Sequence, residues 1–93
     1  MNLNSSNTRQ DPSRIDEFLR LPEVLRVRGL KQSAHYQNVV DGLYTKAVKV
    51  SSRATAWPAS EVRALNSARL AGKSNDEIRE LVKALMAARA VMA

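Results

Sequence analysis

Hydrophobic positions recur at helical spacing near the start of this 93-residue chain. Leu21, Val24 and Leu25 give residues 21–27 one apolar side, which predicts a short helix. Gly29 ends that helix, because glycine tolerates the left-handed conformation that a helix exit requires.

A second helix is predicted over residues 32–41 and is closed by Gly42. Its apolar positions recur at i, i+3, i+4 and i+7, which predicts one buried face. That face comprises Tyr36, Val39, Val40 and Leu43. Two helices joined by a short turn that contains glycine form a helix-turn-helix unit.

The next stretch is typical of a β-hairpin. Residues 47–50 alternate between apolar and basic side chains and predict the first strand. Residues 51–54 suit a turn, and residues 55–57 form the second strand. We expect two strands here. Trp57 is interpreted as a core anchor, because a large aromatic side chain dominates the burial of so small a fold.

Two further helices follow the hairpin. Pro58 opens the first, which reaches Ala71 and has Val62, Leu65 and Ala68 on one face. Ser74 and Glu77 form a capping box that starts the last helix. The last helix carries a continuous apolar stripe of Ile78, Leu81, Val82, Leu85 and Met86. The stripe packs either on the domain or on a partner, and we expect it to mediate self-association.

Composition narrows the function. The chain has no cysteine and only one histidine, His35, so we expect no metal site and no cofactor. We found no catalytic motif and expect no enzyme. Without an apolar run of roughly 20 residues or a hydrophobic signal segment, the expectation is a cytoplasmic protein with no membrane partner. Residues 1–14 are polar and predict a disordered arm.

The positive charge is concentrated in one segment. The net charge is −1 in residues 1–19, +5 in residues 20–57 and +2 in residues 58–93. A field of that sign attracts polyanions, and neutralised phosphates supply most non-specific DNA affinity. The alternative is a solvated basic surface without a partner.

The order of these residues resembles the AlpA family of prophage regulators. The resemblance rests on the run from Phe18 to Leu25, on Gly29, Leu30, Ser33, Tyr36, Gly42, Val48, Lys49, Arg53 and Trp57, and on Ser60, Glu61 and Val62. It implies a mainly α, MerR/excisionase-like winged helix-turn-helix with a two-stranded wing, to which this chain adds a C-terminal helix. His35 departs from the family pattern, which has an aliphatic residue there.

The predicted helix-turn-helix and wing also suggest a set of DNA-binding residues. In a helix-turn-helix, the first residues of the second helix meet base edges in the major groove, and wing residues grip phosphates. The candidates are Lys31, Gln32, Ser33, Tyr36 and Gln37 on the helix and Lys46, Lys49 and Arg53 on the wing. Tyr36 also suits the core, and the wing charges also suit a solvated strand edge.

Residues 15–72 are therefore expected to form the DNA-binding domain and residues 73–93 the C-terminal helix. The resemblance implies a sequence-selective transcriptional regulator of a prophage or mobile element that binds double-stranded DNA. An excisionase that assists an integrase is the alternative within this class. A protein-interaction adaptor that uses the C-terminal helix is the alternative from another class.

Overall fold

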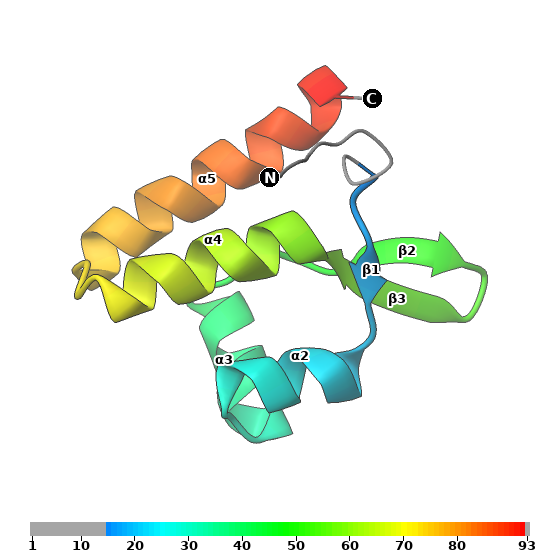
Figure 1. Ribbon diagram of the computed structural model, residues 1–93, viewed down its shortest axis with the longest axis horizontal. Helices are drawn as coiled ribbons and strands as arrows, with labels where there is room; N and C mark the ends of the chain where they lie inside the picture. Colours follow the sequence, from blue (N-terminus) through cyan, green and yellow to red (C-terminus); the bar gives the residue numbers. More distant parts are fainter. Residues whose placement is uncertain (1–14, 93) are drawn as a thin grey trace, which may run out of the picture.

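The computed structural model describes residues 15–92, with side chains described through residue 91. In that part of the chain, four helices surround a three-stranded antiparallel sheet with strand order β1-β3-β2 (Figure 1). The elements are β1 (Phe18–Leu19), α2 (Leu21–Arg28), α3 (Gln32–Val40), β2 (Val48–Ser51), β3 (Ala54–Pro58), α4 (Ala59–Leu70) and α5 (Asn75–Met92). The fold is the mainly helical, small winged helix-turn-helix that the sequence predicted. The arm predicted over residues 1–14 lies outside the described residues.

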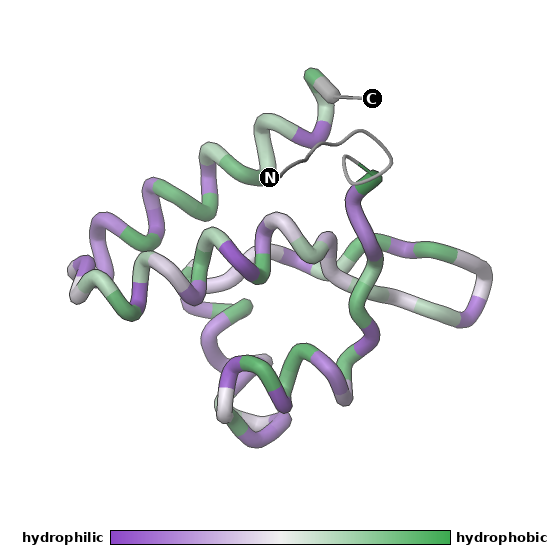
Figure 2. Tube along the Cα trace, viewed as in Figure 1, coloured by the Kyte–Doolittle hydropathy of each residue, from purple (hydrophilic) through white to green (hydrophobic). Residues whose placement is uncertain are grey.

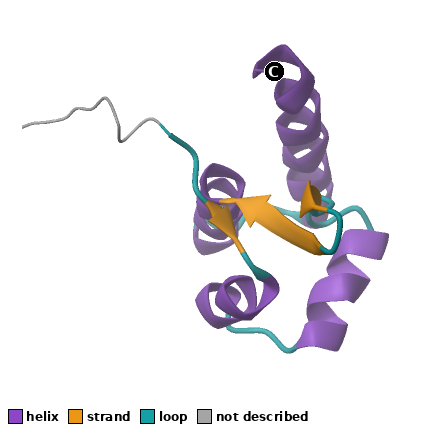
Figure 3. Cartoon of the chain, turned by 90° about the vertical axis from the view of Figure 1, so that its right-hand side faces the viewer, coloured by secondary structure: helices purple, strands orange, loops and turns teal. Residues whose placement is uncertain are grey.

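The sheet adds a third strand to the predicted two-stranded wing. β2 and β3 form the expected hairpin, but β1 adds a third strand through the antiparallel pairs Phe18–Pro58 and Leu19–Trp57. A two-residue strand is too short for a periodic signal, so only its pairing reveals it. The strands lie over the pair formed by α2 and α3 (Figure 3).

The segment before β1 also caps α4. Pro58 is the N-cap residue of α4 and supplies no side-chain acceptor. Instead, Asp16 Oδ1 accepts the backbone N–H of Ser60 at 2.9 Å, and the Glu17 carbonyl accepts that of Ala59 at 2.7 Å. Residues more than forty positions away thus satisfy amide groups that a helix start leaves open.

The hydrophobic core gathers between the sheet and α4. Trp57 is completely buried, as predicted, and its Nε1–H donates to the Thr45 carbonyl at 2.8 Å. The predicted inner face of α4 is confirmed, since Val62, Leu65 and Ala68 are all buried. The core therefore fixes the orientation of the hairpin relative to α4.

The last helix packs against this core. Ile78 and Val82 are buried, and Leu81, Leu85 and Met86 are partly buried against the core residues. Figure 2 shows the hydrophobic positions of α5 on the side that faces α4. This chain therefore covers most of the apolar stripe itself. Self-association through α5 stays a prediction.

Two polar contacts fix the ends of α5. The capping box is confirmed: the Glu77 N–H donates to Ser74 Oγ at 3.1 Å, and the Ser74 N–H donates to Glu77 Oε1 at 2.8 Å. These bonds hold the pKa of the Glu77 carboxyl below its usual value. Near the other end, Arg89 forms a two-bond ion pair with the buried carboxylate of Glu61, at 2.6 and 2.7 Å.

The predicted apolar face of α3 is wrong at two of its four positions. Tyr36 is 40% exposed and Val40 is 78% exposed, whereas His35 is completely buried. Leu43 is buried as predicted, and Val39 is partly buried. The inner side of α3 is thus rotated by about one residue, because a polar histidine occupies the place where the pattern favoured an apolar side chain.

Candidate nucleic-acid interface

The turn between α2 and α3 has the geometry of a helix-turn-helix. Gly29 adopts φ 70°, and its N–H donates to the Leu25 and Arg26 carbonyls, which ends α2. Lys31 is the N-cap residue of α3 in extended conformation and makes no side-chain cap. The start of α3 is therefore uncapped and open to an external acceptor.

All five helix residues predicted to contact DNA are exposed. Lys31, Gln32 and Ser33 lie at the start of α3, with Tyr36 and Gln37 about one turn later. The Gln37 Nε2 donates to Asp41 Oδ1 at 3.0 Å, which leaves the amide oxygen of Gln37 available. The structure thus brings these five side chains together on the outer side of one helix.

The inner side of α3 is held by an arginine from α2. Arg28 Nη1 lies 2.8 Å from His35 Nδ1, and Arg28 Nη2 donates to Asn38 Oδ1 at 2.7 Å. The Arg28 guanidinium carbon also lies 3.8 Å from the centre of the Tyr44 ring, as in a cation–π contact. Arg28 therefore joins both helices to the segment that follows them.

These contacts decide the protonation of His35. A guanidinium only donates hydrogen bonds, so Nδ1 of His35 accepts and the proton of the neutral ring lies on Nε2. Burial, together with the nearby Arg28 charge, lowers the pKa of His35 to about 4. The histidine is therefore neutral at physiological pH and orients α3 as a hydrogen-bond acceptor.

The wing candidates are also exposed. Lys49 lies on β2, and Arg53 lies in the hairpin turn, where its N–H donates to Ser51 Oγ at 3.4 Å. Lys46 precedes β2, and its carbonyl accepts a hydrogen bond from Arg89 at 2.7 Å. α5 thus anchors the backbone from which the wing begins.

Ion pairing distinguishes these candidates from four of the other described cations. Among the described residues, the cations paired with carboxylates are Arg26, Arg79, Lys83 and Arg89. Within the same part of the chain, Lys31, Lys46, Lys49 and Arg53 have no such partner. Their charge therefore remains available to an external anion.

Sequence reasoning missed several polar residues that shape this region. Neither Arg28 nor Asn38 was among the predicted site residues. The exposed cation Arg69 on α4 was also missed. A buried polar residue such as His35 requires a partner, and that requirement is the signal that could have led to Arg28 and Asn38.

In the part of the chain that the structure describes, no helix is sufficiently long and apolar to cross a bilayer. Over the same residues, no three histidine or acidic side chains gather in a way that could hold a metal ion.

Comparison with known proteins identifies the family. The family model of the prophage CP4-57 regulatory protein (AlpA) matches residues 17–70, which is more than half of the chain. The chain belongs to this family. The AlpA match runs from the start of β1 to the end of α4, so it includes the helix-turn-helix and the hairpin but not α5.

One curated relative comes from a virus. The chain is 36% identical over 58 residues to "Uncharacterized protein ORF88" of Enterobacteria phage P4, which covers 62% of this chain. It spans 66% of that relative, just under two thirds of its length. No solved structure matches the chain significantly.

Proposed function

We propose that this AlpA-family chain binds double-stranded DNA sequence-selectively and regulates transcription of a prophage or related mobile element. The proposal rests on the difference between the inner and outer sides of α3. Its inner side is fixed by Arg28 and His35, while its outer side presents Lys31, Gln32 and Gln37 to solvent. A rigid helix with an exposed polar start suits insertion into a major groove.

The chemistry of that outer side suits bases. Glutamine can bond adenine with two hydrogen bonds, and lysine can reach guanine. The unpaired Lys49 and Arg53 on the hairpin suit phosphates, which position a protein on the duplex without reading its sequence. We infer that α3 contacts the bases and that the wing contacts the DNA backbone.

The test first locates the site and then compares variants. Footprinting over the gene's own neighbourhood and the nearest element end should reveal a protected sequence. Gln32→Ala should reduce the preference for that sequence over random DNA by about 1–3 kcal/mol. Arg53→Ala should weaken binding to both DNAs equally and lower the salt slope by about one.

Specific outcomes would contradict the proposed function or one of its parts. Equal losses on both DNAs for Gln32→Ala would remove the base-reading role of α3. Absence of salt-dependent DNA binding by the wild-type chain would contradict the proposed function altogether. Protection over a promoter supports transcriptional regulation, whereas repeated protection beside an attachment site would instead indicate an excisionase.

A further inference from the structure

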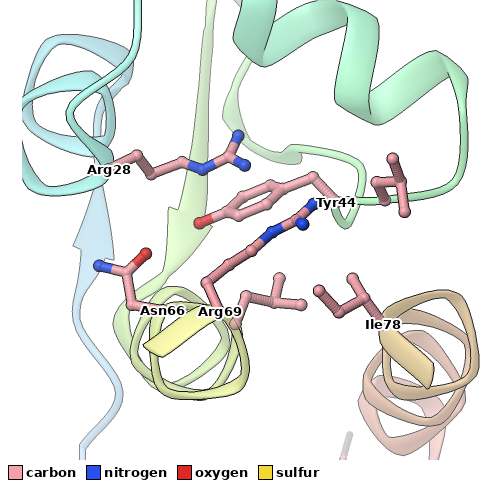
Figure 4. Close-up of a pocket in the computed structure, with 7 residues that line it drawn as sticks. Arg28, Tyr44, Asn66, Arg69 and Ile78 are labelled. Carbon is pink, nitrogen blue, oxygen red and sulfur yellow. The ribbon is translucent and has the colours of Figure 1, made fainter. Parts of the chain in front are cut away.

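A small hollow lies where α2, α4 and the start of α5 meet, away from the outer side of α3. It is lined by Arg28, Leu43, Tyr44, Leu65, Asn66, Arg69 and Ile78 (Figure 4). Its volume of about 10 Å³ is room for roughly one water molecule or one oxygen of a larger group.

Among the described residues, the two arginines beside this hollow have no acidic partner. Within that part of the chain, Arg28 bonds only the neutral His35 and Asn38, and Arg69 reaches only the amide oxygen of Asn75 at 3.4 Å. The residues that line the hollow include no carboxylate. Burial is the main cause that lowers the pKa of Arg28; Tyr44 acts in the opposite direction, and the Arg69 charge lowers this pKa further.

An orphaned hydroxyl points to the same missing partner. Tyr44 is 2% exposed, and its hydroxyl makes no hydrogen bond to any residue that the structure describes. Burial raises the pKa of Tyr44 to about 12, so the group keeps its proton and can donate it. Figure 4 shows this hydroxyl between Arg28 and Asn66, with the Arg69 side chain extending towards Tyr44 from α4. A buried donor beside a cation favours an acceptor that carries negative charge.

We propose that Arg28, Tyr44 and Arg69 form an anion site that holds one oxygen of a DNA backbone phosphate. This inference rests on the proposed DNA binding and adds to it. The C-terminal end of α4, which carries Arg69, lies on the opposite side of the molecule from the hairpin (Figure 1). The site and the wing would therefore hold the duplex backbone on two sides of α3.

The roles of the three residues differ. Arg28 is fixed by its contacts with α3 and supplies a preorganised positive charge. Tyr44 donates its hydroxyl hydrogen to the phosphate oxygen. Arg69 is exposed and lies on the last turn of α4, so it can turn from Asn75 to close over the phosphate.

The first arm of the experiment measures binding to the footprinted duplex by fluorescence anisotropy at several salt concentrations. Arg69→Ala should weaken binding by about tenfold and lower the salt slope by about one. Arg63→Ala is the matched control, because it removes the same exposed side chain from the same helix outside the hollow. Equal losses for the two variants would indicate a diffuse basic surface and overturn the site.

Tyr44→Phe tests the site without changing the charge. It removes a hydroxyl that has no partner in the structure, so the fold should lose no stability. Loss of a hydrogen bond to phosphate should weaken DNA binding by about threefold to tenfold while the salt slope stays the same. Wild-type affinity in Tyr44→Phe would remove the hydroxyl from the site.

The second arm separates the two sources of phosphate. Inorganic phosphate is titrated against the chain at constant ionic strength, without DNA, and the side-chain resonances of Arg28 and Tyr44 are followed by NMR. Saturable shifts that Arg69→Ala abolishes, together with its selective loss of DNA binding, support the proposal. Shifts without any effect of Arg69→Ala on DNA affinity would assign the site to free phosphate and overturn the DNA assignment.

Failure of the proposed function gives a different pattern. If the wild-type chain binds no DNA, both the proposed function and the backbone assignment fall, and the phosphate titration shows whether an anion site exists. The chain could also bind DNA while phosphate causes no NMR shifts and Arg69→Ala leaves the DNA affinity unchanged. That result would overturn the anion site but not the proposed function.

Discussion

Mild acid should lower the stability of the protein through protonation of His35, which holds α3 against α2 and is the only histidine of the chain. Its pKa is lowered to about 4 in the folded state, against about 6.5 in an unfolded chain. Between these values the unfolded state binds more protons than the native state. Stability is therefore present above about pH 6.5 and is lost as the pH falls towards 4.

The magnitude follows from the two pKa values. Each pKa unit corresponds to about 1.4 kcal/mol. Protonation of the unfolded state between about pH 7 and pH 5 should then lower the free energy of unfolding by about 2 kcal/mol. Carboxyl groups with ordinary pKa values near 4 titrate mainly below this window, so the histidine dominates the change.

Urea unfolding followed by tryptophan fluorescence is a suitable assay, because Trp57 is the only tryptophan and is completely buried. We expect the loss of about 2 kcal/mol in the wild type. His35→Gln, which does not titrate, should show an almost flat stability over the same range. An NMR titration midpoint of His35 near 6.5 in the native state, or pH-independent wild-type stability, would refute the reasoning.

Three other perturbations test the packing. Arg89→Ala leaves the buried Glu61 carboxylate unpaired and should cost about 3–5 kcal/mol in urea unfolding; adding Glu61→Leu should recover much of this loss, and no recovery would contradict it. Asp16→Ala should cost about 1 kcal/mol as a lost cap of α4, whereas Glu17→Ala, which keeps the backbone bond, should be nearly neutral. Leu81→Asp should destabilise the whole domain, which circular dichroism would detect as a loss of helix signal. A variant that stays folded but loses dimer mass in sedimentation would instead assign α5 to self-association.

The elements with local signals were predictable. Gly29 and the capping box of Ser74 and Glu77 act over a few residues, and both are visible in the sequence as they occur in the structure. β1 and the cap from Asp16 were not predictable in this way. Their partners lie about forty residues away, and a two-residue strand has no periodicity of its own.

The rotation of α3 shows why hydropathy misassigned its face. The pattern ranked Val40 and Tyr36 as inner positions because their side chains are large and apolar. The native face instead buries His35 and places Asn38 beside it, and both are paired by Arg28. A polar side chain is stable inside only when a specific partner satisfies it, and that partner comes from another helix.

The candidate site was predictable in its charge but not in its arrangement. Sequence analysis placed the positive excess around the helix-turn-helix, but it could not distinguish a structural cation from an available one. Arg28 is both a structural cation and an available one, since it orients α3 and also lines the hollow. An Arg28 variant would therefore lose DNA affinity whether or not the hollow binds phosphate. Among the described residues, the Arg69 guanidinium and the Tyr44 hydroxyl make no hydrogen bond to α3, so Arg69→Ala and Tyr44→Phe can separate a phosphate contact from a misplaced recognition helix.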